Sequence, residues 1–278
     1  MLVTKSRHIS CRLPCFALRR ARQPPTRVAR GRRVKRLVHQ VLAKAGLHIE
    51  RVRDPYVDAV NLAAVADLDL AVDGGAYKGV ATQRLLEACP GARVLAFEPM
   101  PDFAEKLRTR FASEPRVRVI QKALSDENGS ATFHVHATRF TSSLHEIADP
   151  AGEMQEVQKV VVEKTRLDDV LDTVDARSIV VKLDLQGHEH AALLGMSRAL
   201  TDGRIRTLIA EVNFARRYAA GCSFADIVTL LGGVGFGLHR LYELRLTAGD
   251  GYEIGDAVFV RDPGRALLSP RCETRRAS

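Results

Sequence analysis

The sequence predicts an α/β fold: a mostly parallel twisted sheet with helices on both faces and an antiparallel edge strand. Strand-like and helix-like segments alternate along most of the chain, and a glycine-rich turn joins the first strand to its helix. The last two strand-like segments follow each other without a helix, as in an antiparallel pair. Apolar residues make up 46% of the 278 residues, which suffices for a large core.

The first half alternates regularly between short apolar runs and segments with helical spacing. The expected elements are a strand at 68–72, a helix at 80–88, a strand at 93–97, a helix at 101–111 and a strand at 117–120. Such alternation is typical of strand-helix-strand units, which place their strands in parallel.

The middle of the chain breaks this alternation. Strand-like segments at 131–135 and 157–162 flank a polar stretch, 136–156, that has no clear period and is a candidate insertion or lid. Alternation then resumes with a strand at 178–183, a helix at 189–200, a strand at 207–212 and a helix at 224–231. The segments 237–241 and 256–260 are expected to form the antiparallel edge.

Composition divides the chain into four parts. They are a basic leader at 1–36, a helical segment at 37–66, the main domain at 67–263 and a tail at 264–278, and we expect the leader and the tail to be disordered. Apolar residues at spacings of three and four predict a helix over 34–46. The leader resembles an organelle transit peptide or a polyanion-binding arm, but a disordered tail or a misplaced start codon fits it equally well and is the interpretation that we favour.

The charge of the chain is concentrated in that leader. Its twelve Lys and Arg residues, taken from a net charge of +9, leave −3 for the remainder, so no specific nucleic-acid partner is expected. The sequence has no apolar run long enough for a transmembrane segment. Five cysteines without C-x-x-C or metal-ligand spacing predict reduced thiols and a cytoplasmic location.

The turn after the first strand has the glycines of a nucleotide-binding loop. A dinucleotide fingerprint beginning at Gly74 would need a glycine at position 76, where this chain has Ala76. Asp73 would place a carboxylate where a pyrophosphate must lie. An adenosyl cofactor without phosphates fits better, because Asp73 can pair with the ammonium of its methionine part.

A second acidic residue follows the next strand. Glu98 ends the segment 93–97 and is followed by Pro99. A carboxylate at this strand tip can accept hydrogen bonds from both ribose hydroxyls, although a solvated strand end is the plain alternative.

Six phrases in one order carry a family resemblance. They are Asp73-Gly74-Gly75-Ala76-Tyr77-Lys78-Gly79, Phe97-Glu98-Pro99-Met100-Pro101, Ala123-Leu124-Ser125-Asp126, Arg166-Leu167-Asp168-Asp169, Lys182-Leu183-Asp184-Leu185-Gln186-Gly187-His188-Glu189 and Ala210-Glu211-Val212. Over residues 68–260 the chain resembles the FkbM family of methyltransferases.

The resemblance implies a Rossmann-like methyltransferase fold and S-adenosylmethionine as cofactor. It also implies methyl transfer to a hydroxyl oxygen of a natural product, sugar or lipid-linked acceptor. The cofactor-binding residues that it implies are Asp73, Gly74, Gly75, Ala76, Tyr77, Gly79, Glu98, Pro99, Ala123, Leu124, Ser125 and Asp184. Tyr77 and His188 depart from the small residues that the family often has at these positions.

Methyl transfer to an alcohol needs a group that takes the hydroxyl proton. Asp184 and His188 are the candidates, because open sheets bind their ligands where strands end and helices begin. Asp184 as a simple helix cap and His188 as a solvated residue are the alternatives. No metal is expected, since adjacent residues such as His188, Glu189 and His190 do not share one helix face.

Five further residues are candidates for contact with the acceptor. Thr141, Ser142 and Ser143 lie in the polar stretch, and Glu211 and Asn213 end the strand at 207–212. Ordinary loop or strand-end solvation is the alternative for all five. The sequence identifies neither the acceptor nor the oligomeric state.

Two other functions remain open at this point. An NAD-dependent oxidoreductase is disfavoured by Ala76 and Asp73, and a non-enzymatic polyanion-binding protein would depend on the leader. A nucleic-acid methyltransferase would be expected to carry an Asn-Pro-Pro-Tyr-type signature where this chain has Asp184 to Gly187.

Overall fold

The computed structural model describes residues 53–63, 68–137, 142–146, 155–215, 218, 220–247 and 251–261. The basic leader, the helix predicted at 34–46 and the predicted tail lie outside these residues. No helix in the described ranges is long and apolar enough to cross a membrane.

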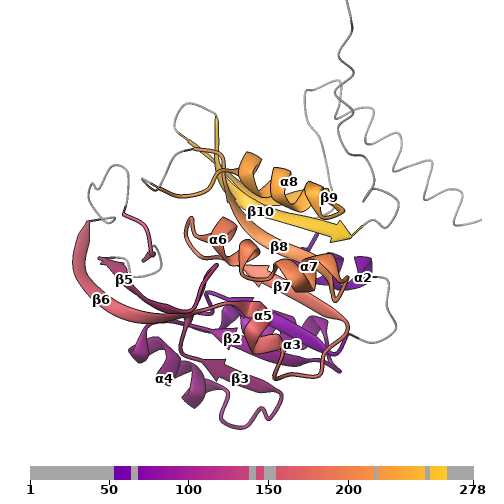
Figure 1. Cartoon of the computed structure of the whole chain (residues 1–278), viewed down its shortest axis with the longest axis horizontal. Coiled ribbons are helices and arrows are strands. Elements are labelled where there is room, and N and C mark those ends of the chain that lie inside the picture. The colour runs from indigo at the N-terminus through magenta and orange to yellow at the C-terminus, as the bar shows by residue number, and fades with distance from the viewer. Residues whose placement is uncertain are drawn as a thin grey trace, which may run out of the picture. The chain divides into compact units, whose positions relative to one another are not determined.

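A seven-stranded sheet forms the centre of the described chain, with the order β3-β2-β1-β7-β8-β10-β9 (Figure 1). Its strands are β1 (Leu70–Gly74), β2 (Arg93–Phe97), β3 (Val117–Ile120), β7 (Ile179–Leu183), β8 (Ile205–Asn213), β9 (Phe236–Leu246) and β10 (Tyr252–Arg261). Strands β3, β2, β1, β7 and β8 are parallel, whereas β10 is antiparallel to both β8 and β9. The predicted fold class is therefore confirmed.

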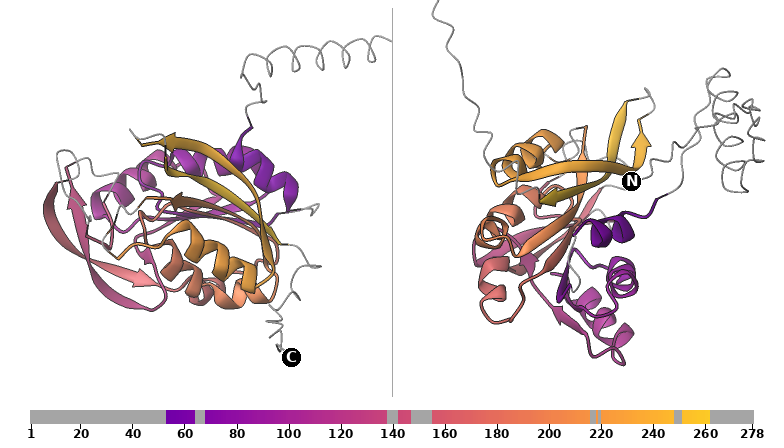
Figure 2. Two further views of the ribbon diagram at one scale, coloured as in Figure 1. Left: turned by 90° about the horizontal axis from the view of Figure 1, so that it is seen from above. Right: turned by 90° about the vertical axis from the view of Figure 1, so that its right-hand side faces the viewer.

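Helices cover both faces of this sheet (Figure 2). One face carries α2 (Pro55–Leu62) and α3 (Val80–Ala88), and α4 (Pro101–Arg110) lies between β2 and β3 in the chain. The other face carries α5 (Leu167–Leu171), α6 (Glu189–Leu194), α7 (Ser197–Thr201) and α8 (Phe224–Gly233). Every residue of β1 is buried because the strand faces a core on each side, which explains its unbroken apolar run.

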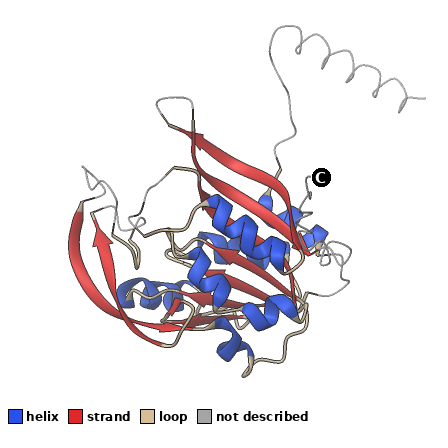
Figure 3. Cartoon of the chain, turned by 45° about the horizontal axis from the view of Figure 1, so that its top comes forward, coloured by secondary structure: helices blue, strands red, loops and turns tan. Residues whose placement is uncertain are grey.

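A second sheet, of three strands in the order β4-β6-β5, was not predicted. It contains β4 (Ala123–Leu124), β5 (Gly129–His136) and β6 (Glu156–Thr165). The two long strands were predicted, but as flanks of an insertion. They form an antiparallel hairpin that curves away from one side of the molecule (Figure 3).

The single helix predicted over 189–200 was wrong, because the chain forms α6 and α7 with a break at Gly195 and Met196. The buried carboxylate of Asp168 accepts hydrogen bonds from the backbone N–H groups of Arg198 and Ala199, at 2.9 and 3.0 Å. These bonds cap the N-terminus of α7, so a new helix starts there. A Cβ at Gly195 would lie 1.8 Å from the carbonyl oxygen of Ser125, so the break also allows a close backbone approach.

Candidate active site

Two adjoining pockets lie where β1, β2, β7 and β8 end. The Glu98 pocket has largely apolar walls, formed by Phe97, Pro99, Met100, Phe103, Ala123, Leu124, Phe133 and Leu144. The Asp256 pocket is more polar and includes Tyr56, Arg84, Lys182, Glu243 and Asp256. Both pockets are lined by Gly75, Tyr77, Asp184, Glu211, Arg245 and Ile254. This position, outside the carboxyl ends of parallel strands, is where open α/β sheets bind ligands.

The glycine-rich turn requires glycine at two of its positions. Gly75 has φ +80, and a Cβ there would lie 2.0 Å from the carbonyl oxygen of Asp184. Gly79, with φ +79, precedes α3, and a Cβ there would lie 2.7 Å from the Phe111 ring. Neither position accepts a side chain without movement of its neighbours.

Asp73 lies beneath this turn and lines neither pocket. Its fully buried carboxylate accepts a 2.6 Å hydrogen bond from Thr82 Oγ1 and lies 3.6 Å from Lys182 Nζ. Burial raises the pKa of Asp73, and the charge of Lys182 opposes that effect. Asp73 thus anchors the turn from below, and direct contact with the methionine end of the cofactor stays a prediction.

Glu98 presents a buried carboxylate to the apolar pocket. Its Oε2 accepts a hydrogen bond from the Tyr77 N–H at 2.8 Å, and its Oε1 accepts one from the Met100 N–H at 2.9 Å. Burial raises the pKa of Glu98 to about 7, although these two bonds favour the charged form. The Glu98 pocket thus combines a strand-end carboxylate with apolar walls.

Asp184 and Glu211 face the junction of the pockets and are joined by one amide. Gln186 Nε2 donates to Asp184 Oδ1 at 2.6 Å and to Glu211 Oε2 at 2.7 Å. Gln186 has φ 54, and its Oε1 accepts a 2.6 Å hydrogen bond from the Tyr218 hydroxyl. Asp184 Oδ2 also lies 3.3 Å from Lys182 Nζ. The two carboxylates thus differ in their partners, since among the described residues only Asp184 forms an ion pair.

His188 lines the Glu98 pocket, but both of its ring nitrogens already have partners. Nε2 lies 3.0 Å from Ser125 Oγ, and Nδ1 lies 3.0 Å from His145 Nε2. Burial, with a smaller contribution from His145, lowers the pKa of His188 to about 4. In this arrangement neither nitrogen is free to receive a proton from an acceptor.

The residues predicted to contact the acceptor are dispersed. Ser142 lines the Glu98 pocket and Glu211 lines both pockets. Ser143 is buried outside the pockets and donates to the carbonyl oxygen of Gln186 at 2.7 Å. Asn213 is also buried outside them, without a hydrogen-bond partner for its amide among the described residues. Thr141 lies outside the described residues.

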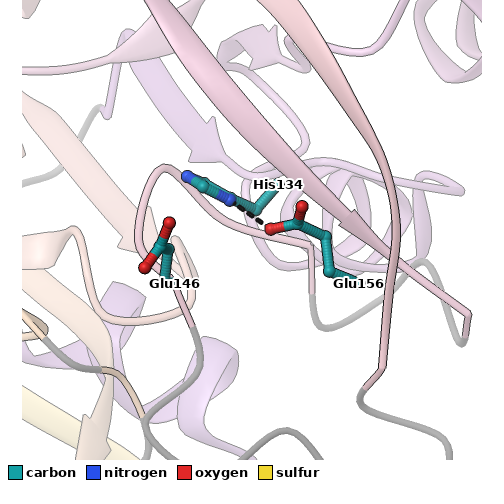
Figure 4. A group of neighbouring side chains, drawn as sticks. All are labelled: His134, Glu146 and Glu156. Atoms are coloured by element: carbon teal, nitrogen blue, oxygen red, sulfur yellow. Dashed lines mark hydrogen bonds and ion pairs between the residues drawn. The ribbon is translucent and has the colours of Figure 1, made fainter.

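An ionic cluster links the hairpin to the segment 142–146 (Figure 4). His134 Nδ1 lies 2.5 Å from Glu156 Oε2, and one oxygen of Glu146 lies within 4.8 Å of both groups. Lys159 Nζ is 3.5 Å from Glu146 and 3.7 Å from Glu156, so a protein cation already balances these carboxylates. The expectation of no metal site stays a prediction.

Most of the predicted site residues meet at the two pockets. Those that line them are Gly75, Ala76, Tyr77, Glu98, Pro99, Ala123, Leu124, Ser142, Asp184, His188 and Glu211. Those among the described residues that do not line them are Asp73, Gly74, Gly79, Ser125, Ser143 and Asn213. Sequence reasoning assigned no role to Lys182 and Gln186, although both stand in a phrase that it singled out. It also missed Arg245 and Asp256, which no motif marks.

Comparison with known proteins adds a family match. The model described as "Methyltransferase FkbM domain" matches residues 73–243. The 2-O-methyltransferase NoeI of Sinorhizobium fredii (strain NBRC 101917 / NGR234) is 29% identical over 171 residues, which cover 58% of this chain and 70% of NoeI.

Two solved structures are similar to this chain at low sequence identity. Aeropyrum pernix fibrillarin with bound S-adenosyl-L-methionine is 9% identical, with 74% of this chain and 76% of that chain covered and a TM-score of 0.41. The 1,6-didemethyltoxoflavin-N1-methyltransferase of Burkholderia thailandensis is 15% identical, with 90% and 99% covered and a TM-score of 0.38.

Proposed function

Because this chain belongs to the FkbM domain family of methyltransferases, we propose that it transfers a methyl group from S-adenosylmethionine to a hydroxyl oxygen. The predicted family, enzyme class and cofactor are confirmed. Neither an NAD-dependent oxidoreductase nor a non-enzymatic polyanion-binding protein agrees with this family.

The residues of the Glu98 pocket fit the cofactor. Glu98 would hold the ribose hydroxyls, while Met100, Leu124 and Phe133 would surround the adenine. Three carboxylates, those of Glu98, Asp184 and Glu211, face this pocket and would repel a pyrophosphate. When bound, S-adenosylmethionine supplies an electrophilic methyl group on a positively charged sulfur.

The observation that supports a hydroxyl acceptor is the pair of carboxylates at the junction of the pockets. Asp184 and Glu211 both accept a hydrogen bond from the side-chain amide of Gln186. A hydroxyl group can donate to either carboxylate, which would orient its oxygen toward the methyl group. The name of NoeI, a 2-O-methyltransferase, agrees with an oxygen acceptor. We place this small-molecule acceptor in the Asp256 pocket.

A panel assay tests the proposal. The full chain is incubated with methyl-tritiated S-adenosylmethionine and nitrophenyl glycosides, polyketide alcohols or lipid-linked alcohols, with the matching amino and carboxyl compounds as controls. We expect label in an ether product from at least one hydroxyl compound. Transfer only to an amine or carboxyl compound contradicts the proposal.

Two wider assignments belong to the same proposal. The methyltransferase domain occupies 67–263, and the enzyme works in the cytoplasm, where the free thiols of Cys89 and Cys222 would stay reduced. Deletion of the basic leader, 1–36, tests its part in the reaction, and unchanged methyl transfer would exclude one.

A further inference from the structure

Glu211 stands apart from the other ionisable groups at the pocket junction. It lies near the end of β8 and lines both pockets, and its Oε2 accepts the 2.7 Å hydrogen bond from Gln186 Nε2. No described residue donates a hydrogen bond to its Oε1 or forms an ion pair with it. One oxygen of Glu211 is therefore held in place while the other remains available to a ligand.

The two residues singled out from the sequence are less suited to receive a proton. Asp184 has Lys182 Nζ 3.3 Å from Oδ2 and the Gln186 amide 2.6 Å from Oδ1, so both of its oxygens already have partners. His188 has a partner on each ring nitrogen, Ser125 and His145.

We propose that Glu211 is the catalytic base that removes the hydroxyl proton of the acceptor, and that Gln186 is the residue that positions it. This inference rests on the proposed function. The hydroxyl proton passes to Glu211 Oε1, and the electron pair left on the oxygen forms the bond to the methyl carbon. The bond between methyl and sulfur breaks with its electron pair going to sulfur, so the sulfonium charge is lost as Glu211 becomes neutral.

The surroundings of Glu211 make its carboxylate more basic than usual. Burial raises its pKa well above the ordinary value, and the negative charges of Asp184, Glu189 and Asp256 act in the same direction. Lys182 opposes them, and Arg245 faces the same two pockets. A base whose pKa lies closer to the working pH takes a proton more effectively in the transition state.

Gln186 can position Glu211 because it is itself fixed. The Tyr218 hydroxyl donates to the side-chain oxygen of Gln186, Oε1, at 2.6 Å. Both hydrogens on Nε2 are therefore left for the carboxylates of Asp184 and Glu211. At φ 54 the best substitute is asparagine, which tolerates this backbone region but has a side chain too short to keep the same contacts.

The experiment compares Glu211→Gln with Asp184→Asn, Gln186→Asn and the control Glu87→Gln, which alters an exposed carboxylate on α3. Isothermal titration with S-adenosylhomocysteine first checks that each variant folds and keeps its cofactor site. The kcat is then measured against pH with the hydroxyl compound that the wild-type chain methylates best.

We expect Glu211→Gln to bind S-adenosylhomocysteine within about threefold of wild type, to lower kcat by roughly 10²- to 10⁴-fold and to lose the rise of kcat with pH. Asp184→Asn should lower kcat but keep that rise. Gln186→Asn should move it to higher pH, because the carboxylate loses a donor.

Retention of the rise in Glu211→Gln, or a kcat within about threefold of wild type, overturns the proposal. Loss of the rise in Asp184→Asn alone assigns the base to Asp184 instead. A wild-type chain that binds S-adenosylhomocysteine but methylates no hydroxyl compound overturns the proposed function itself. The assignment of Glu211 as the base for a hydroxyl acceptor is then overturned as well.

Discussion

The ammonium group of Lys182 lies 3.6 Å from the fully buried carboxylate of Asp73. The same nitrogen is 3.3 Å from Asp184 Oδ2. One cation therefore bridges the carboxylate of Asp73, which packs behind the glycine-rich turn, and the carboxylate of Asp184 at the pocket junction. Lys182 is itself buried, and its pKa is raised because the charges of Asp184 and Asp73 outweigh the effect of burial. Loss of this cation would leave buried negative charge uncompensated.

We therefore expect Lys182→Met to lower the free energy of unfolding by about 3–5 kcal/mol, as measured by urea denaturation. The control is Lys164→Met, which removes a 2.6 Å ion pair with Glu127, a residue whose side chain is 70% exposed. That change should cost about 0–1 kcal/mol. Equal losses of unfolding free energy in the two variants would mean that the buried ion pairs of Lys182 stabilise the chain no more than an exposed one does.

Gly75→Ala should both destabilise the chain and abolish binding of S-adenosylhomocysteine. The new Cβ would lie 2.0 Å from the Asp184 carbonyl oxygen at φ +80, so the turn must move. We expect a loss of more than about 1 kcal/mol in thermal or urea unfolding. Gly232→Ala in α8 meets no atom within 4 Å and should be stabilising by about 0.5–1 kcal/mol. Normal cofactor binding by Gly75→Ala would contradict the close approach.

Cofactor affinity should rise with pH through the pKa of Glu98, which is about 7. This pKa is raised on folding, so the folded chain holds the proton to higher pH than the unfolded chain does. Without cofactor, the folded state therefore loses stability as pH rises from about 4.5 to about 7. Ribose hydroxyls that donate to the carboxylate would restore that stability and release a proton. We expect titration calorimetry to give S-adenosylhomocysteine roughly tenfold weaker binding at pH 6 than at pH 8.

Glu98→Gln should remove this pH dependence and weaken binding at pH 8, whereas Glu105→Gln, which alters an exposed residue of α4, should leave both unchanged. A pH-dependent affinity that persists in Glu98→Gln would assign the proton to another group.

Acid should destabilise the chain through His188, whose pKa falls from 6.5 to about 4 on folding. The unfolded chain binds the proton first, so stability present above about pH 6.5 is lost as pH falls toward 4. The full effect amounts to about 3 kcal/mol, and His188→Gln should lack it. Urea unfolding at a series of pH values measures the difference, with His239→Gln at an exposed position as the control. The same acid sensitivity in wild type and His188→Gln would rule out this origin.

Much of the central sheet could be predicted because its signals are local. The helix at Val80–Ala88 and the strand at Arg93–Phe97 have the expected bounds, since apolar periodicity and flanking turns define both. The break between α6 and α7 could not be predicted, because the carboxylate that caps α7 belongs to Asp168, far away in the chain. The β4-β6-β5 sheet depends in the same way on pairing between distant strands.

The residues of the candidate site that could be predicted are those with local sequence signals, and those that depend on distant partners could not. Glu98, Asp184 and Glu211 were found because strand ends can be read from the sequence. The burial of Asp73 was not foreseen, since it depends on Thr82 and Lys182 packing beneath the turn. Gln186 went without a role because its partners come from two other parts of the chain, Glu211 and Tyr218.

The place of β1 at the centre of the sheet also affects how the protein folds. β1 pairs with β2 on one side and with β7, far along the sequence, on the other. During synthesis the glycine-rich turn therefore emerges long before Leu183, and one flank of β1 stays open in the meantime. Closing so long a loop carries an entropic cost before any contact compensates it, which makes the pairing of β1 with β7 a slow step. An exposed apolar strand edge during that interval is an aggregation risk that a chaperone could relieve.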